Sequence, residues 1–504
     1  MNRDTSRIRW WPLPAIAAVV AALLARAWLW DDVIRQVRVL RSYTALLVGA
    51  VLLLLWLSFF SRLSRRARLS AWALLLLGAA ACVGLFRYRG LTGDLEPIFE
   101  PRFGGRRVTP VSADAAHLGA PGRDFPQFLG PERNATIRGV SLARDWEARP
   151  PRLVWRQEVG GGWSGFAVSG GVAITQEQQG EKEFVIAREL GTGERRWSVL
   201  HGKTYVSAIA GDGPRATPTV TRDRVYALGS RGILMALEFE SGDVLWTRDT
   251  LADEAVPKWG AAGSPLLVRE LVVVAGGPEG SSLAAFSSED GSPVWSAGDD
   301  PAAYASPALL SLDGEPQIVA FNAGSVSGHS PGTGAVLWSQ PWPRQQPNVV
   351  QPLPLPGSQL LVSAGYGVGS KLFRISRVEG TWRSELVWET PRLKAKFTNM
   401  VAHRGLVYGL DDGVLVCLDP ETGKRRWKRG RYGHGQLLLV GDLLLVQAEA
   451  GEVVLLEPDP ERLIELGRFT AIEGKVWNAP ALAGSWLLVR NDREAAAFEL
   501  PLEP

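Results

Sequence analysis

The chain has 504 residues and a formal net charge of +3 at pH 7. A charge this small and of mixed sign excludes the concentrated basic surface of nucleic-acid-binding proteins, so we expect no nucleic-acid partner. The 55 glycines, 33 prolines and 20 tryptophans are typical of a chain with many turns and many large apolar anchors. The only two cysteines, Cys82 and Cys417, lie in unrelated segments and predict no structural disulfide.

Three apolar segments near the N-terminus are candidates for membrane spans. Residues 42–61 and 69–86 carry no charged side chain and have about the 20 residues that a spanning helix needs. Residues 10–30 are a weaker candidate, because Pro12, Pro14 and Arg26 interrupt them, although tryptophans flank both ends as at a membrane interface. A cleaved signal peptide is the alternative for this first segment. We therefore predict two to three transmembrane α-helices within residues 1–90.

The arginines around these segments predict their orientation. Arg3, Arg7 and Arg9 precede the first segment, and four arginines separate the second from the third. The loop between the first two segments balances its arginines with Asp31 and Asp32. Because cytoplasmic loops carry the excess of basic residues, the N-terminus and the second loop are expected in the cytoplasm. Three spans in a bacterial inner membrane then leave the rest of the chain on the periplasmic side.

Residues 91–123 are rich in proline, glycine and charge, and they are expected to form a linker between the membrane region and a domain over residues 124–504. A repeated pattern fills this domain. Its clearest copy is LMALEFESGDVLW, from Leu234 to Trp246, which predicts a strand, a turn with glycine and a second strand that ends on tryptophan. The closing tryptophans recur every 39 to 50 residues, the length of a propeller blade, at Trp155, Trp197, Trp246, Trp295, Trp338, Trp388 and Trp427.

The count of repeats predicts an all-β domain, an eight-bladed β-propeller of four-stranded blades. Seven units close at the tryptophans from Trp197 onward and at a degenerate position near Leu466. The eighth unit is split between the two ends of the domain. Its inner strands are predicted at residues 476–482, 486–490 and 495–500, and Leu153-Val154-Trp155 supplies its outer strand. This pairing closes the ring and removes exposed strand edges.

A family resemblance supports this fold. The segment Asp124–Arg133, DFPQFLGPER, followed by Leu-Val-Trp and by copies of Thr-Gly-x-x-x-Trp, resembles the pyrroloquinoline-quinone (PQQ)-like β-propeller repeat proteins. The resemblance covers about residues 124–500. That superfamily contains quinone-dependent dehydrogenases and non-enzymatic scaffolds, so the resemblance implies two alternatives for the function.

The candidate ligand-binding residues lie before the predicted inner strands. Motifs such as ATPTV (216–220) and NAPAL (478–482) place a small residue and proline where these strands begin. If the preceding connections meet at one mouth of the channel, their large side chains form a funnel for a ligand. The alternative is that the aromatic groups only fill the channel. The candidate funnel consists of Trp163, Trp259, Tyr304, Lys396, Phe397 and Trp477.

The dehydrogenase alternative implies PQQ and calcium, held by a tryptophan floor, an adjacent-cysteine disulfide and carboxylate and amide ligands. This chain has no adjacent cysteines, its funnel candidates are aromatic or basic, and its five histidines show no metal-ligand spacing. We therefore expect no metal site, no catalytic residues and no cofactor. The predicted function is a membrane-anchored binding or scaffold module for envelope proteins or peptides, and the alternative is a PQQ-dependent dehydrogenase that oxidises alcohols or sugars.

Overall fold

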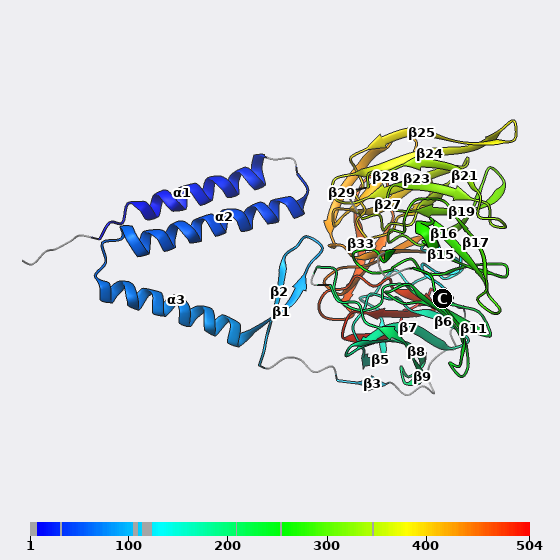
Figure 1. The fold of residues 1–504 in the computed structure, drawn as a ribbon, viewed down its shortest axis with the longest axis horizontal. Coiled ribbons are helices and arrows are strands. Elements are labelled where there is room, and N and C mark those ends of the chain that lie inside the picture. The colour runs from blue at the N-terminus through cyan, green and yellow to red at the C-terminus, as the bar shows by residue number, and fades with distance from the viewer. Residues whose placement is uncertain are drawn as a thin grey trace, which may run out of the picture. The chain divides into compact units, whose positions relative to one another are not determined.

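The structure is a computed structural model that describes residues 8–30, 33–103, 109–112, 123–207, 209–251, 255–344 and 347–503 (Figure 1). The chain divides into two compact units, Met1–Arg107 and Val108–Pro504. Four residues used above to predict orientation, Arg3, Arg7, Asp31 and Asp32, lie outside the described residues. So do residues 104–108 and 113–122 of the predicted linker.

The first unit contains three long apolar helices. Helix α1 (Pro12–Ala25) continues as a π-helical turn to Trp30, α2 (Arg35–Leu55) continues likewise to Phe60, and α3 spans Arg65–Leu85. Each is long and apolar enough to cross a membrane. Helices α2 and α3 begin before the predicted residues 42 and 69, because the arginines that precede the apolar runs are themselves good helix formers.

A short hairpin follows α3, and the sequence analysis did not predict it. Strand β1 (Phe86–Leu91) pairs antiparallel with β2 (Pro97–Pro101), and the ring of Tyr88 packs edge-on against Phe99. The alternation of aromatic residues and arginine in FRYR suits a strand, but it follows directly on an apolar helix without a turn residue between them. The apolar sequence therefore continues from α3 into β1 without a signal that marks where the strand begins.

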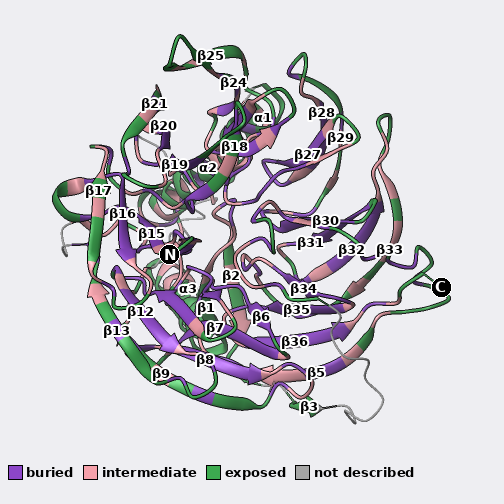
Figure 2. Cartoon of the chain, turned by 90° about the vertical axis from the view of Figure 1, so that its right-hand side faces the viewer, coloured by how far each residue is buried: buried purple, intermediate pink, exposed green. Residues whose placement is uncertain are grey.

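The second unit is an eight-bladed β-propeller of four-stranded blades, as predicted (Figure 2). Each blade is an antiparallel meander that runs from the central channel outward. Seven blades follow one another in chain order. Blade 1 consists of β6 (Ala167–Ser169), β7 (Val172–Gln179), β8 (Lys182–Glu189) and β9 (Arg195–Lys203), blade 2 of β10 (Thr219–Val220), β11 (Arg224–Leu228), β12 (Ile233–Glu238) and β13 (Val244–Asp249), and blade 3 of β14 (Leu266–Val268), β15 (Leu271–Ala275), β16 (Leu283–Ser287) and β17 (Pro293–Ala297). Blade 4 consists of β18 (Ala308–Leu312), β19 (Glu315–Phe321), β20 (Ser325–His329) and β21 (Val336–Pro341), blade 5 of β22 (Leu353–Leu355), β23 (Gln359–Ala364), β24 (Gly369–Val378) and β25 (Thr381–Thr390), blade 6 of β26 (Val401–His403), β27 (Leu406–Asp411), β28 (Val414–Asp419) and β29 (Lys424–Arg431), and blade 7 of β30 (Gln436–Val440), β31 (Leu443–Gln447), β32 (Glu452–Glu457) and β33 (Ile464–Thr470).

Blade 8 is built from both ends of the domain, which confirms the split-blade prediction. Its inner strands β34 (Ala481–Ala483), β35 (Trp486–Arg490) and β36 (Glu494–Glu499) are completed by β5 (Arg152–Glu158). A further strand, β3 (Val111–Ser112), pairs with the outer edge of β5. The innermost strand begins at residue 481 and not at 476, because Pro480 has no amide to donate to the sheet.

The repeated tryptophan joins several of the blades to their neighbours. The indole of Trp155 in blade 8 donates to the carbonyl of Leu190 in blade 1 at 2.7 Å and covers Gly193 in the same hairpin. A Cβ added to Gly193 would lie 2.6 Å from that ring, and its φ is +72°, so two constraints require glycine there. The same contact joins Trp197 to Gly242, Trp246 to Gly291, Trp295 to Gly334 and Trp388 to Gly423.

A second set of contacts joins the blades where the inner strands begin. The amide of Gly165 donates to Oγ1 of Thr217, the amide of Thr217 to Oγ of Ser264, and the amide of Ser264 to Oγ of Ser306, at 2.9–3.1 Å. These hydroxyls belong to the residues that precede proline in the predicted motifs. The motifs therefore supply hydrogen-bond acceptors between blades as well as small side chains.

The segment 124–137, which we call the plug, lies against the inner strands. The backbone of Phe125 exchanges hydrogen bonds with Val168 in β6, and the carbonyl of Pro126 accepts from Val220 in β10. Its last residues form β4 (Thr136–Ile137), which pairs in parallel with β30. The plug is thus attached to blades 1, 2 and 7.

Arg133 attaches the plug to blades 3 and 4. Its buried guanidinium donates to the carbonyls of Ser264 and Pro265 in blade 3 and Pro307 in blade 4, at 2.5–3.0 Å. Burial lowers the pKa of Arg133 to about 9, so the group is still protonated at neutral pH and these hydrogen bonds are charge-assisted. The segment that carries the family resemblance therefore has a structural role that the sequence analysis did not predict.

The tryptophan contact predicts unequal effects of alanine at two glycines with positive φ. Gly291 (φ +70°) lies under Trp246, whereas Gly314 (φ +77°) has no neighbour within 4 Å of an added Cβ. We expect Gly314→Ala to cost about 1–2 kcal/mol for the left-handed backbone alone. Gly291→Ala should cost roughly 1–3 kcal/mol more, because the methyl group displaces the ring. Denaturation of the full-length protein measures both, and equal losses would contradict the contact.

Candidate functional site

All six predicted funnel residues lie on one face of the propeller, in connections that lead to inner strands. Trp163 precedes β6, Trp259 precedes β14, Tyr304 precedes β18, Lys396 and Phe397 precede β26, and Trp477 precedes β34. The structure brings them into two neighbouring groups around the channel mouth. Together with four residues described below, we call them the mouth cluster: Trp163, Tyr205, Trp259, Tyr304, Tyr366, Lys396, Phe397, His434, Lys475 and Trp477.

The first group is centred on Trp477. Its ring centroid lies 4.9 Å from those of Trp163 and Phe397, and Phe397 lies 5.2 Å from the ring of His434. The indole of Trp477 donates to a carboxylate oxygen of Glu449 at 2.8 Å, and the indole of Trp163 donates to the carbonyl of Ala210 at 2.8 Å. Blades 1, 6, 7 and 8 are therefore joined through one aromatic contact surface.

The second group is centred on Trp259. Its ring is stacked on Tyr304, with centroids 5.4 Å apart, and lies 6.4 Å from Tyr366. The Nζ of Lys396 lies 4.8 Å from the centroid of Tyr366, and Tyr205 donates its hydroxyl hydrogen to the carbonyl of Lys258. Since Lys396 and Phe397 are adjacent, they connect this group to the first. Each of the eight blades thus contributes at least one residue to the mouth cluster.

Sequence reasoning did not find Tyr205 and Tyr366. Tyr366 lies between β23 and β24, a connection that turns at the same face but does not lead to an inner strand. Tyr205 lies in a long connection, well before β10. The signal that identified the other residues was proximity to an inner strand, and neither tyrosine carries it.

The cluster combines aromatic rings with two lysines. Lys396 is 1% exposed, and the Nζ of Lys475 lies 3.9 Å from the centroid of Trp477 and 4.8 Å from that of Trp163. Burial lowers the pKa of Lys475 to about 8, which leaves most of it protonated at pH 7. Burial also raises the pKa of Tyr304 and Tyr366, so both remain neutral phenols. Such a surface suits anionic or carbonyl-bearing groups.

The residues at this mouth do not fit PQQ with calcium. Among the described residues of Val108–Pro504, no three His, Cys, Asp or Glu side chains lie within ligand distance of one another. Cys417 is buried in β28, and Cys82 belongs to the other unit, so the two cannot form an adjacent pair. Trp477 would be a candidate for the tryptophan floor under PQQ, but its ring already packs against Trp163, Phe397 and Lys475. The arrangement of these residues therefore supports no reaction that uses PQQ.

Comparison with known proteins identifies the family. The family model described as outer membrane protein assembly factor BamB matches residues 147–278 and 191–429, which together make up more than half of the chain. The chain belongs to the PQQ-like, BamB-type β-propeller family. This confirms the resemblance and the fold predicted from the sequence.

Individual members of this and related families are distant. BamB of Shewanella oneidensis is 25% identical over 310 residues, which cover 56% of this chain and 74% of that protein. The quinohemoprotein alcohol dehydrogenase of Comamonas testosteroni superposes with a TM-score of 0.56 at 13% identity, covering 77% of this chain and 82% of that one. BamB of Moraxella catarrhalis gives a TM-score of 0.38 at 17% identity, covering 67% and 85%. At this identity, the dehydrogenase shares the fold alone.

The depressed pKa of Lys475 predicts a pH-dependent stability. Between pH 8 and the ordinary value of 10.5, the unfolded chain holds a proton that the folded chain has released, so the free energy of unfolding rises with pH. From pH 8 to 9.5, wild type should gain roughly 2 kcal/mol relative to Lys475→Met. Denaturation of both proteins at several pH values measures this difference. Parallel pH profiles would show that Lys475 is as basic as an exposed lysine.

Proposed function

We propose that this chain is a membrane-anchored, extracytoplasmic binding or scaffold module, and that its mouth cluster binds a segment of another envelope protein or a peptide. The observation that carries the proposal is the convergence of residues from every blade on one mouth, with half-buried aromatic rings beside two lysines. The relationship to BamB, an outer membrane protein assembly factor by name, supports a role in binding other proteins.

The chemistry of the mouth favours a peptide-like ligand. Tryptophan and tyrosine lose little conformational entropy on contact, because each has only two side-chain torsions. Lys475 lies half-buried next to these rings, where its positive charge suits a carboxylate or a backbone carbonyl, and the buried Lys396 adds positive charge beside Tyr366. A ligand that spans the mouth would contact several blades at once, so its affinity depends on the closed ring of blades.

The placement in the envelope rests on the first unit. Helices α1, α2 and α3 are long enough to anchor the chain in a membrane. Arg62 lies between the second and third helices, and Arg65, Arg66 and Arg68 lie at the start of α3. The positive-inside rule assigns this basic end of the helix to the cytoplasm. An odd number of spans then assigns the propeller to the periplasmic side of a bacterial inner membrane.

Pull-down from the envelope fraction tests the proposal. We expect Trp477→Ala and Trp259→Ala to reduce recovery of the bound partner several-fold and to change the melting temperature little. Trp382→Ala is a matched control, because Trp382 also has a basic neighbour, with the Arg377 guanidinium 5.7 Å from its ring centroid, but lies in β25 outside the cluster. If the melting temperature fell while recovery was unchanged, the cluster would be channel packing and not a binding site.

The dehydrogenase alternative is tested on the same protein. Incubation with PQQ and calcium, followed by dye-linked assays with alcohols and sugars, should give no turnover above a heat-denatured control. Measurable oxidation that depends on both additions would contradict the binding-module proposal and support a quinone-dependent dehydrogenase.

A further inference from the structure

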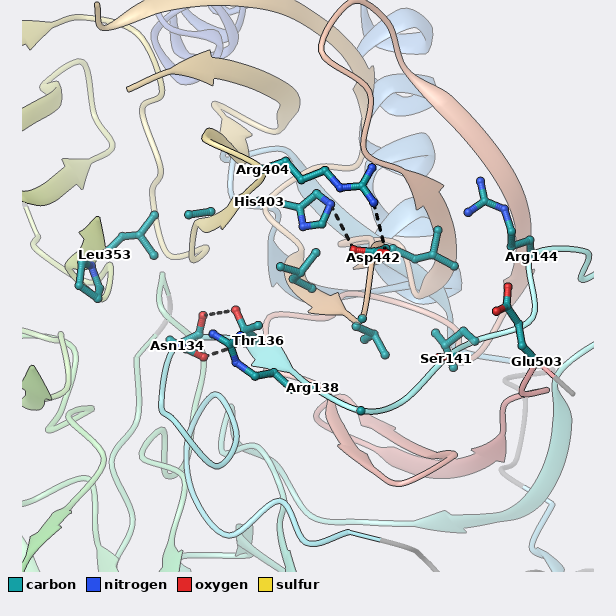
Figure 3. Close-up of a pocket in the computed structure, with 18 residues that line it drawn as sticks. Asn134, Thr136, Arg138, Ser141, Arg144, Leu353, His403, Arg404, Asp442 and Glu503 are labelled. Atoms are coloured by element: carbon teal, nitrogen blue, oxygen red, sulfur yellow. Dashed lines mark hydrogen bonds and ion pairs between the residues drawn. The ribbon is translucent and has the colours of Figure 1, made fainter. Parts of the chain in front are cut away.

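A pocket of about 680 Å³ lies on the face of the propeller where inner strands end. Figure 3 shows the side chains that line it. Its lining includes Arg404, in the turn that follows β26, and Asp442, in the turn that follows β30. These turns lie where inner strands end, whereas the mouth cluster lies where they begin. The pocket is therefore a separate site, and the inference below does not depend on the function proposed for the mouth cluster.

The pocket lies beside blades 5 and 6, which are two of the three blades to which no described hydrogen bond connects the plug; the third is blade 8. The described hydrogen bonds of the plug connect it to blades 1, 2, 3, 4 and 7. Among the described residues, no strand pairs with the inner edge of β22 in blade 5 or β26 in blade 6. Leu353 and Pro354 of β22 and Ala402 of β26 line the pocket. Blades 5 and 6 thus present, beside the pocket, inner strand edges that no described strand of the chain covers.

Three arginines line the pocket together with the acidic residues Asp442 and Glu503. Arg138, Arg144 and Arg404 line it, and their charged groups pair with Glu132 at 3.3 Å, Glu457 at 2.6 Å and Asp442 at 3.3 Å. The Arg138 and Arg404 side chains are 72% and 71% exposed, so these pairs contribute little stability and can exchange partners. A planar guanidinium binds a carboxylate through two parallel hydrogen bonds. An incoming acidic group can therefore replace the present partners.

His403 adds a polar group without a hydrogen-bond partner. Its side chain is 10% exposed, and its Nε2 accepts and donates no hydrogen bond, since the nearest acid, Asp442, is 3.7 Å away. Burial lowers the pKa of His403, and the charge of Arg404 lowers it further while that of Asp442 opposes them. The imidazole is therefore neutral at pH 7, and its free nitrogen can hydrogen-bond to a ligand in the pocket.

We propose that this pocket binds an extended acidic peptide segment of another protein, laid along the inner edges of β22 and β26. The backbone of the segment would pair with these open edges, as the plug pairs with β30 through β4. Its acidic side chains or terminal carboxylate would bind Arg138 and Arg404, and apolar side chains would contact Leu353 and Ala402. The pairing of β4 with β30 is an example within this chain of an extended segment bound along an inner strand. The arginines favour a negatively charged segment.

The test uses the full-length protein and three fluorescein-labelled hexapeptides that alternate valine with glutamate, glutamine or lysine. Fluorescence anisotropy should show the glutamate peptide binding about tenfold more tightly than the glutamine peptide, and the lysine peptide binding least. Combined Arg138→Glu and Arg404→Glu should abolish this preference. Arg269→Glu is the matched control, because Arg269 occupies the corresponding turn after β14, also with a positive φ (+54°, against +49° for Arg404), and does not line the pocket.

Melting temperatures establish that each variant is folded, and Arg404→Gln with Arg138→Gln provides a second pair in case reversed charges disturb the turns. The proposal is overturned if the three peptides bind equally, or if Arg269→Glu weakens binding as much as the pocket variants do. Complete displacement of the glutamate peptide by millimolar inorganic phosphate would also overturn it, because it would indicate a site for small anions. Displacement by excess unlabelled glutamate peptide alone supports it.

Discussion

The contact between the tryptophan of one blade and the glycine of the next is the interaction on which the propeller depends. It recurs at five junctions, from Trp155 over Gly193 to Trp388 over Gly423, and the first of these contacts joins blade 8, which is built from both ends of the domain, to blade 1. The glycine is required twice, for a left-handed backbone and for the space under the ring. The contact therefore holds one blade against the next at each of these five junctions.

The two faces then present different chemistry. Where inner strands begin, hydroxyls of Thr217, Ser264 and Ser306 fix the blades to one another, and the residues just before them project aromatic rings and lysines around the mouth. Where inner strands end, β4 of the plug pairs with β30, and a pocket lined by Arg138, Arg144 and Arg404 lies beside this pair. The two faces of one scaffold of repeated blades therefore differ in chemical character.

The sequence predicted the parts of this structure that repeat at regular intervals along the chain. Recurrent tryptophans gave the number of blades, and the isolated Leu-Val-Trp at residues 153–155 predicted the split blade. Six residues of the mouth cluster were found because they precede inner strands. The sequence analysis missed Tyr366 because this residue reaches the mouth from the connection between β23 and β24, which does not lead to an inner strand. It missed the plug because the contacts of the plug join residues far apart in sequence, such as Arg133 and Pro307. Contacts of this kind occur once and do not repeat, so they produce no regular spacing in the sequence.

The central claim is that the mouth cluster is where this protein meets its partner, and site-specific photo-crosslinking in cells tests it most directly. A photoreactive phenylalanine analogue placed at Tyr304 of the full-length chain should crosslink to one or a few discrete envelope proteins. The same analogue at Arg383, an exposed position of β25, should not. Crosslinks that appear equally from both positions, or from Arg383 alone, would contradict the account.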